Sequence, residues 1–172
     1  MTQPPQQEIP PLAAVVYDEG EPIDALFAQV RAILEARGQR VGGVVQTPCA
    51  ETIYAIHIDS GRSFDLMQDL GACASGCRLD SGALAEAAGL LAQSLAARPD
   101  LLLVSRFGRA EAEGGGFLAE IGAAAAAGQP TLIGVARKRW DDWRAFAGDC
   151  AACLSCDAAA VLAWRDSLSA RA

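Results

Sequence analysis

The sequence is short of positive charge and of long apolar runs, and it contains a single histidine. Its formal net charge of −7 repels nucleic acid and anionic membranes on average, so an anionic ligand would need a local cationic pocket. No uncharged apolar run reaches the ~18 residues that a membrane span needs. Residues 1–11 lack the basic and apolar parts of a secretory leader. We therefore expect a cytoplasmic protein without nucleic-acid or membrane partners, with its six cysteines reduced.

The remaining composition is typical of an α/β globule, with 52% hydrophobic residues and 17 glycines. We expect a flexible lead-in over residues 1–11 and a single domain over residues 12–172. Apolar runs predict strands at 12–17, 41–46, 101–104 and 130–136, and alternation predicts a β-hairpin over 53–67. Helical periodicity and capping predict helices at 23–37, 81–97, 117–127, 140–146 and 158–168. This order predicts three layers around a mostly parallel sheet with an added hairpin.

The strand that begins at Leu101 ends abruptly in polar residues. Four apolar residues in a row are typical of a strand buried on both faces of a parallel sheet. Ser105 and Arg106 follow them directly, and Gly108 comes two residues later. Ligands of open α/β sheets bind at the carboxyl ends of the strands. These residues are therefore candidates for a ligand site.

The turn after the first strand lies where a phosphate loop would be. Such a loop reads G-x-x-x-x-G-K-[ST], in which glycines let backbone amides cradle phosphate, lysine neutralises it and the hydroxyl holds magnesium. Here the lysine position is Ile23 and the hydroxyl position is Asp24. The loop also holds Asp18, Glu19 and Glu21, whose negative charges would repel a triphosphate. We expect a degenerate phosphate loop made of Tyr17, Asp18, Glu19, Gly20, Glu21, Pro22, Ile23 and Asp24.

Further motifs carry a resemblance to known families. They are Arg40-Val41-Gly42-Gly43, Ser60-Gly61, Phe107-Gly108-Arg109-Ala110-Glu111 with Phe117, and Gly128-Gln129-Pro130. With them the chain resembles the small P-loop nucleoside triphosphatases first known from thermophiles, which implies a P-loop-like fold. Two more motifs, Gln68-Asp69-Leu70-Gly71 and Gly76-Cys77-Arg78-Leu79-Asp80, are similar to an uncharacterised bacterial domain family that shares this outline. The resemblance to that family implies a gene encoded beside molybdate transport genes.

The same resemblance bears on hydrolysis. In the triphosphatases the strand motif reads Asp-Glu-Ile-Gly-Lys-Met-Glu, and its acidic pair serves magnesium and the attacking water. By position, Ser105 and Arg106 replace that pair, which implies that hydrolysis is lost and that donors for an anion are gained. Arg78 precedes a helix N-terminus, where negative charge is favoured, and Arg137 ends the neighbouring strand.

We expect these groups to bind a tetrahedral oxyanion such as molybdate or tungstate, with no other cofactor. The candidate ligand-binding residues are Gly76, Cys77, Arg78, Ser105, Arg106, Gly108, Arg109 and Arg137. In this reading Cys77 is a soft neighbour of the ion. The alternative is that Arg78, Arg106 and Arg137 form a structural network with acids, namely Asp69, Asp80, Glu111 and Glu113.

Two other functions stay open. One is a nucleotide-binding hydrolase or transferase with a remodelled site. The other is a pseudo-enzyme interaction module, in which the acidic loop docks a basic partner. Trp140, Trp143 and Phe146 have helical spacing, which favours core packing near the ligand edge or a contact in a homo-oligomer.

The cysteines and the histidine favour structural roles. The run Cys150-x-x-Cys153-x-x-Cys156 resembles part of an iron–sulfur motif, but a [4Fe–4S] cluster needs a fourth thiolate and a zinc site needs a fourth ligand. We expect ordinary thiols there and no metal. His57 lies on an alternating strand, where a structural role is expected, and no Ser–His–Asp arrangement is apparent from the sequence.

Overall fold

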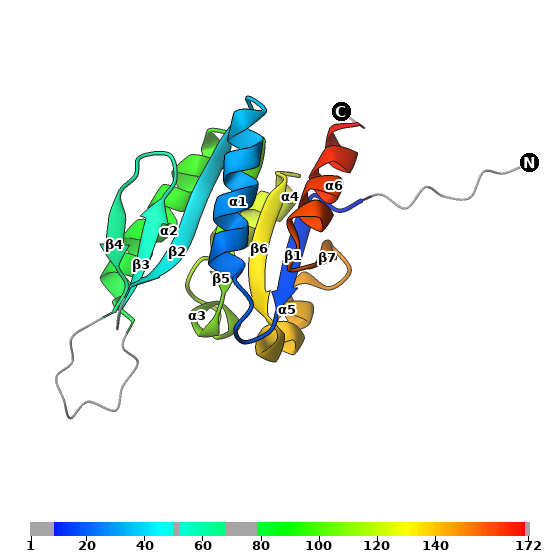
Figure 1. Cartoon of the computed structure of the whole chain (residues 1–172). Coiled ribbons are helices and arrows are strands. Elements are labelled where there is room, and N and C mark those ends of the chain that lie inside the picture. The colour runs from blue at the N-terminus through cyan, green and yellow to red at the C-terminus, as the bar shows by residue number, and fades with distance from the viewer. Residues whose placement is uncertain (1–8, 50–51, 68–78, 171–172) are drawn as a thin grey trace, which may run out of the picture.

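A computed structural model describes residues 9–49, 52–67 and 79–170. In these ranges the chain forms a seven-stranded sheet in the order β4-β3-β2-β5-β6-β1-β7 (Figure 1). The strands are β1 (Leu12–Tyr17), β2 (Val41–Cys49), β3 (Thr52–His57), β4 (Ser63–Asp65), β5 (Leu101–Phe107), β6 (Thr131–Ala136) and β7 (Ala151–Ser155). The helices are α1 (Ile23–Ala36), α2 (Ser81–Ala96), α3 (Arg109–Ala112), α4 (Leu118–Ala126), α5 (Trp140–Ala147) and α6 (Ala158–Ser169), with a 3₁₀ turn η1 (Arg137–Arg139).

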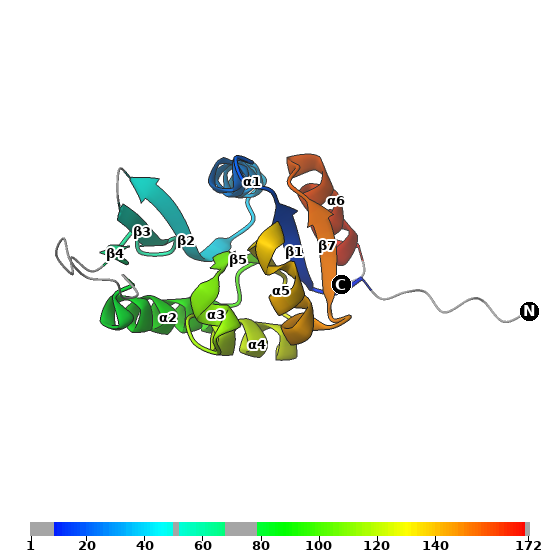
Figure 2. The ribbon, with the colours of Figure 1, turned by 90° about the horizontal axis from the view of Figure 1, so that it is seen from below.

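The predicted α/β fold class is confirmed. Strands β2, β5, β6, β1 and β7 are parallel, and the β3–β4 hairpin extends the sheet in antiparallel fashion from β2. Figure 2 shows α1 and α6 on one face and α2, α4 and α5 on the other. The predicted strands and helices are all present, and the carboxyl ends of the parallel strands lie at the lower edge in Figure 1.

The strand β5 is the centre of both apolar cores. Leu102 and Val104 pack in the cluster that includes α2 and α4, while Leu101 and Leu103 pack in the cluster that includes α1 and α6. All four side chains are at most 1% exposed. Burial of both faces explains why this segment has no polar alternation, as the sequence predicts for an interior parallel strand.

Close packing of β2 against β5 explains one glycine motif. Gly43 has a φ of +119°, and a Cβ there would lie 2.1 Å from the carbonyl oxygen of Leu103. Any larger residue would have to move the backbone of the central strand. The glycine pair after Arg40 therefore permits strand contact, and it lies at the opposite edge from the carboxyl ends of the strands.

His57 joins the hairpin to α2 through a satisfied polar network. Its Nδ1 lies 2.7 Å from Ser60 Oγ, and its Nε2 lies 2.9 Å from Ser94 Oγ and 3.2 Å from Asp59 Oδ2. Ser94 also donates to Asp59, and Gly43 N donates to the same carboxylate oxygen. One imidazole nitrogen therefore contacts both the serine and the acid, whereas a catalytic triad uses different nitrogens for them. This arrangement fits the structural role expected for His57.

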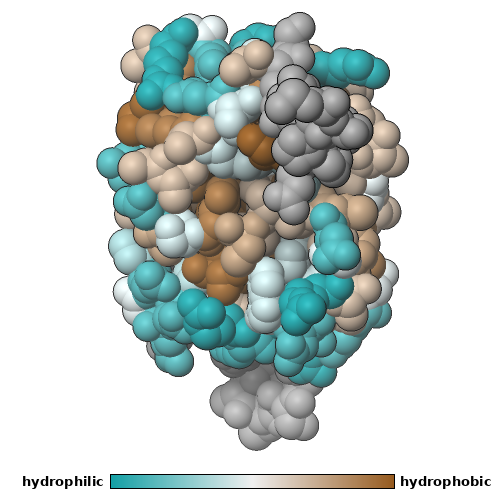
Figure 3. Space-filling model, turned by 90° about the vertical axis from the view of Figure 1, so that its right-hand side faces the viewer, coloured by the Kyte–Doolittle hydropathy of each residue, from teal (hydrophilic) through white to brown (hydrophobic). Residues whose placement is uncertain are grey.

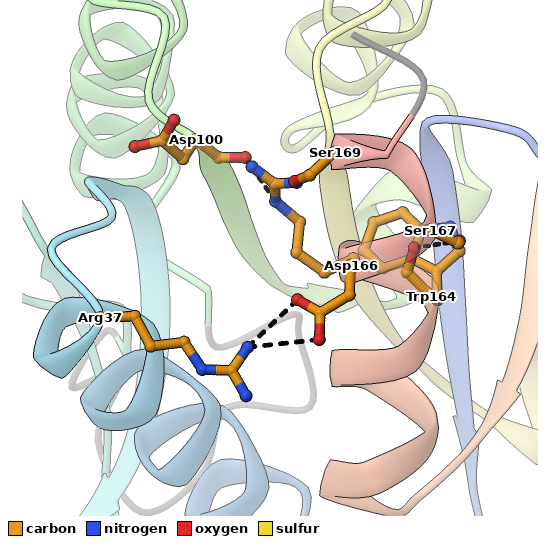
Figure 4. Close-up of polar contacts among 7 residues, drawn as sticks. Arg37, Asp100, Trp164, Asp166, Ser167 and Ser169 are labelled. Atoms are coloured by element: carbon orange, nitrogen blue, oxygen red, sulfur yellow. Dashed lines mark hydrogen bonds and ion pairs between the residues drawn. The ribbon is translucent and has the colours of Figure 1, made fainter.

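Hydrogen bonds and an ion pair made by side chains hold α6 against the rest of the domain (Figure 4). Arg37 Nη1 lies 3.1 Å from Asp166 Oδ1, which links α1 to α6. Arg165 is only 6% exposed and donates from Nε to the carbonyl oxygen of Asp100 at 2.9 Å. Trp164 Nε1 donates to the carbonyl oxygen of Pro10 at 3.0 Å, so the end of the expected lead-in is attached to the domain.

Three elements were not predicted, namely the 3₁₀ turn η1, the helix α3 and the strand β7. The helix α3 has a single turn, too short for helical periodicity to register. The strand β7 has the sequence Ala-Ala-Cys-Leu-Ser, with little β-branched content, and it pairs in parallel with β1 at the sheet edge. Figure 3 faces this side and shows apolar side chains across its middle, with hydrophilic ones below. Among the described helices, none combines the length and the hydrophobicity that a membrane crossing requires.

Candidate functional site

The carboxyl ends of β1, β5 and β6 enclose a pocket of about 820 Å³. This edge is the one seen face-on in Figure 2. The volume is in the range of small-molecule and cofactor sites. The pocket is lined by Tyr17, Asp18, Glu19, Gly20, Glu21, Ile23, Asp24, Ile53, Arg106, Phe107, Gly108, Arg109, Ala136, Arg137, Lys138 and Arg139.

The lining of this pocket is rich in both charges. Its basic side chains are Arg106, Arg109, Arg137, Lys138 and Arg139, and its acids are Asp18, Glu19, Glu21 and Asp24. The acids come from the β1–α1 turn and, in the case of Asp24, from the first turn of α1, whereas the bases come from the ends of β5 and β6 and the segments that follow them. The pocket thus holds one more basic than acidic side chain, in a chain with a net charge of −7.

Arg106 and Asp24 form the central ion pair. Arg106 Nη2 lies 2.8 Å from both carboxylate oxygens of Asp24, on the first turn of α1. The guanidinium carbon also lies 5.7 Å from the centre of the Tyr17 ring, within the range of a cation–π contact. Burial raises the pKa of Tyr17, while the charge of Arg106 opposes that rise. These three residues therefore join β1, α1 and β5 at the pocket floor.

Two other arginines of the pocket lining, Arg137 and Arg109, are also paired. Arg137 Nε donates to Asp18 Oδ1 at 2.7 Å, and this hydrogen bond, together with the charge of Asp18, raises the pKa of Arg137. Arg109 pairs with Glu113 at 2.7 Å. These side chains are more than half exposed, so solvent weakens both pairs. The guanidinium groups at the rim can therefore exchange partners at little cost.

The β1–α1 turn uses its own acid where a phosphate loop would hold phosphate. Glu21 Oε2 accepts a hydrogen bond from the backbone amide of Asp18 at 2.5 Å. The amide of Glu21 donates to the carbonyl oxygen of Asp18, and the amide of Ile23 donates to the carbonyl oxygen of Glu21. Three amides of the turn are thus engaged within the turn. This conformation differs from a cradle whose amides point at a ligand.

Two buried polar atoms on adjacent residues lack hydrogen-bond partners in the described part of the chain. They are Ser105 Oγ and Arg106 Nε. Ser105 is 1% exposed and does not line the pocket. Unpaired buried donors are rare and call for an explanation. Arg106 therefore has hydrogen-bonding capacity beyond its contacts with Asp24.

Glu111 holds the segment that follows β5. Its carboxylate is 5% exposed and accepts hydrogen bonds from the backbone amides of Gly108 at 2.8 Å and Phe117 at 3.0 Å. A Cβ on Gly116 would lie 2.1 Å from Glu111 Oε1, so a glycine is needed there. Glu111 thus positions Gly108, which lines the pocket next to Arg106.

Aromatic packing supports the same segment from the other face. Trp143 is 1% exposed and meets Phe107 edge-on, with ring centres 5.3 Å apart. Phe146 lies against Phe107 at 6.2 Å and is 38% exposed. Trp143 thus has the core packing that the sequence indicates, whereas Phe146 is exposed at the surface.

The structure brings together part of the predicted oxyanion site. Arg106, Gly108, Arg109 and Arg137 line one pocket, together with seven of the eight residues predicted for the degenerate loop, all but Pro22. Gly76, Cys77 and Arg78 lie outside the described residues. Of the three arginines expected to converge, Arg106 and Arg137 line the same pocket, and Arg78 is among the residues that are not described.

The structural network considered as an alternative forms with different acids. Glu113 pairs with Arg109, which is not one of the three arginines of that network. Glu111 and Asp80 instead accept hydrogen bonds from backbone amides, and Asp69 lies outside the described residues. The partners of Arg106 and Arg137 are Asp24 and Asp18. Sequence reasoning missed these pairs, although acids and arginines at one predicted sheet edge were a signal for them.

The cysteine run follows an extended path. Cys153 lies on β7, between Cys150 before the strand and Cys156 after it. A spacing of three residues along a strand separates side chains by about 10 Å, so these thiols do not converge on one ion. Burial raises the pKa of Cys156, and the nearby Glu21 adds to the rise. Within the described residues, no group of three or more potential metal ligands is found.

With this geometry in view, comparison with known proteins decides the family. The sequence matches the family described as "Protein of unknown function (DUF2478)" over residues 12–164. The chain belongs to the DUF2478 family. A curated relative is the molybdenum import ATP-binding protein ModC 2 of Bradyrhizobium diazoefficiens, which is 34% identical over 166 residues. The match covers 93% of this DUF2478 chain but only 18% of that protein, so the chain spans a small part of its relative.

A solved structure shows the relation of the fold. THEP1 from the hyperthermophile Aquifex aeolicus matches with a TM-score of 0.64, over 92% of this chain and 97% of that one. The two sequences are 12% identical, so the likeness concerns the fold alone. It confirms that this DUF2478 chain has a P-loop-NTPase-like α/β fold. The link to molybdate transport genes stays a prediction.

Proposed function

We propose that this chain binds a tetrahedral oxyanion, molybdate or tungstate, without hydrolysing a nucleotide, and that it serves molybdenum homeostasis. The observation that carries the proposal is Arg106. It stands at a position where the resembling triphosphatases have a magnesium-serving acid, and it lies in a pocket at the ligand edge of the sheet. Its partner Asp24 stands at the hydroxyl position of the phosphate loop, which also serves magnesium.

These two positions are 82 residues apart in sequence, and their side chains meet at 2.8 Å. A guanidinium therefore lies where a hydrated cation would bridge the two positions. A positive group in this place can attract an oxyanion directly, with bonds that are stronger than neutral ones. The name of the curated relative, molybdenum import ATP-binding protein, supports molybdate as the ion.

Calorimetric titration of molybdate in a buffer containing EDTA tests this function. Because a hydrogen bond to a charged group contributes about 1.5–3 kcal/mol, Arg106→Ala is expected to weaken binding about 10- to 100-fold. Arg62→Ala is the matched control, since Arg62 also has one ion pair, with Glu86, and one aromatic contact, with Phe64, but does not line the pocket. Absence of binding by the wild-type chain, or equal affinity of the wild type and Arg106→Ala, would contradict the proposal.

The pocket volume favours a second candidate, a nucleotide. About 820 Å³ exceeds the space of a five-atom ion and is typical of cofactor-sized ligands. In this candidate the chain is a nucleotide-binding hydrolase or transferase with a remodelled site. Titration with ADP and ATP, followed by an assay for magnesium-dependent phosphate release, separates it from oxyanion binding.

A further inference from the structure

We propose that Asp24 sets the affinity of this anion site, because its carboxylate occupies the Arg106 guanidinium until a bound anion displaces it. The inference rests on the proposed function and extends it. It assigns to one acid on the first turn of α1 the role of an internal competitor for the ligand. Asp24 is then a residue of the binding site itself.

The geometry of the pair supports this role. Both oxygens of Asp24 lie 2.8 Å from one nitrogen, Nη2 of Arg106, so the carboxylate contacts a single corner of the guanidinium. A bidentate anion instead accepts from two nitrogens in parallel. The side chains are 31% and 27% exposed, so the pair borders solvent and can separate without unfolding the core.

The donors of Arg106 are incompletely used in this pairing. A guanidinium has five N–H donors. Nε is buried and, among the described residues, finds no acceptor, and the adjacent Ser105 Oγ is in the same condition. An oxyanion that accepts from Nε and Nη2 together would satisfy a donor that Asp24 leaves unpaired. The exchange of Asp24 for a ligand therefore gains a hydrogen bond.

A purely structural pair predicts the opposite response. If Asp24 only positions Arg106 for the ligand, its removal would leave the guanidinium misplaced, and binding would weaken. If Asp24 competes with the ligand, its removal would free the guanidinium, and binding would tighten. The sign of the affinity change thus distinguishes the two roles.

The test is calorimetric titration of molybdate into the wild-type chain and Asp24→Asn. Since partly exposed ion pairs are weak, we expect the affinity to rise about 2- to 5-fold in Asp24→Asn. Asp142→Asn is the matched control, because it removes one negative charge beside Arg139 at the rim and leaves Arg106 untouched. Its affinity should change less than about twofold.

Two further variants keep the result interpretable. Asp24→Ser removes the same charge, and serine is compatible with the start of a helix. This variant therefore replaces Asp24→Asn if Asp24→Asn fails to fold. In Asp24→Asn/Arg106→Ala, the affinity should match that of Arg106→Ala alone, because Asp24 acts through Arg106. Thermal unfolding by circular dichroism confirms that each variant is folded.

The outcomes separate this inference from the proposed function. Tighter binding in Asp24→Asn that depends on Arg106, with measurable binding by the wild type, supports both. Binding by the variant alone supports the competitor role and contradicts the proposed function. Wild-type binding that is unchanged or weakened in Asp24→Asn overturns the competitor role and leaves the proposed function standing. Failure of the wild type and of both Asp24 variants to bind molybdate overturns the two together.

Discussion

Replacing Glu111 by glutamine tests whether the segment after β5 depends on one buried carboxylate. Each hydrogen bond to a charged acceptor contributes about 1.5–3 kcal/mol, and a neutral one contributes about 0.5–1.5 kcal/mol. Glutamine keeps one neutral acceptor but turns an NH₂ group toward the second of the two amides that Glu111 accepts from, Gly108 N and Phe117 N. We therefore expect the free energy of unfolding to fall by about 2–4 kcal/mol.

Urea unfolding followed by circular dichroism measures this change. For a domain of this size, the expected loss corresponds to a fall in Tm of about 5–15 °C. Glu113→Gln is the matched control, because Glu113 lies two residues away but its side chain is 62% exposed. It should change the stability by less than about 0.5 kcal/mol. A loss below about 1 kcal/mol in Glu111→Gln, with an unchanged denaturant slope, would refute the importance of this carboxylate.

Two further predictions concern the strand contact and the cysteines. Gly43→Ala should lower the free energy of unfolding by about 3 kcal/mol or more, because the new Cβ meets the carbonyl of Leu103, whereas Gly89→Ala, at an open position on α2, should raise it by about 0.5–1 kcal/mol. Equal tolerance of the two substitutions in urea unfolding would contradict this. Because burial raises the pKa of Cys156, iodoacetamide at about pH 8 should alkylate it more slowly than the exposed Cys150 and Cys153. Peptide mass spectrometry measures the rates, and equal rates for the cysteines would argue against the buried environment of Cys156.

The expected outline of the fold agrees with the structure because local signals and tertiary packing coincide. The run Leu101–Val104 is apolar on both faces, and the structure buries both faces. Asp80 precedes a helical run, and its carboxylate caps α2 by accepting from the amide of Ala83. Strand β7 escaped prediction because its position depends on pairing with β1 rather than on its own residues.

The site was harder to predict than the fold. The position of Arg106 at the end of β5 followed from strand patterning and the general rule for parallel sheets. Its partner did not, because Asp24 lies 82 positions away and only the arrangement of β1, α1 and β5 brings them together. The sequence predicts that Asp18, Glu19 and Glu21 repel a ligand, whereas the structure pairs Asp18 with Arg137. Asp24, on the first turn of α1, pairs with Arg106.

The sequence by itself determined the layers of this protein, the edge of the sheet that carries polar groups and the loss of the residues that phosphate loops need. Those features depend on local periodicity and on residue identity, which the chain displays directly. Only the tertiary structure decided which charged side chains pair. It also decided that Glu21 accepts a hydrogen bond from a backbone amide of its own turn, and that Glu111 accepts hydrogen bonds from backbone amides rather than from an arginine. Charge pairing depends on distances of a few ångströms between segments remote in sequence, and only the folded sheet sets those distances.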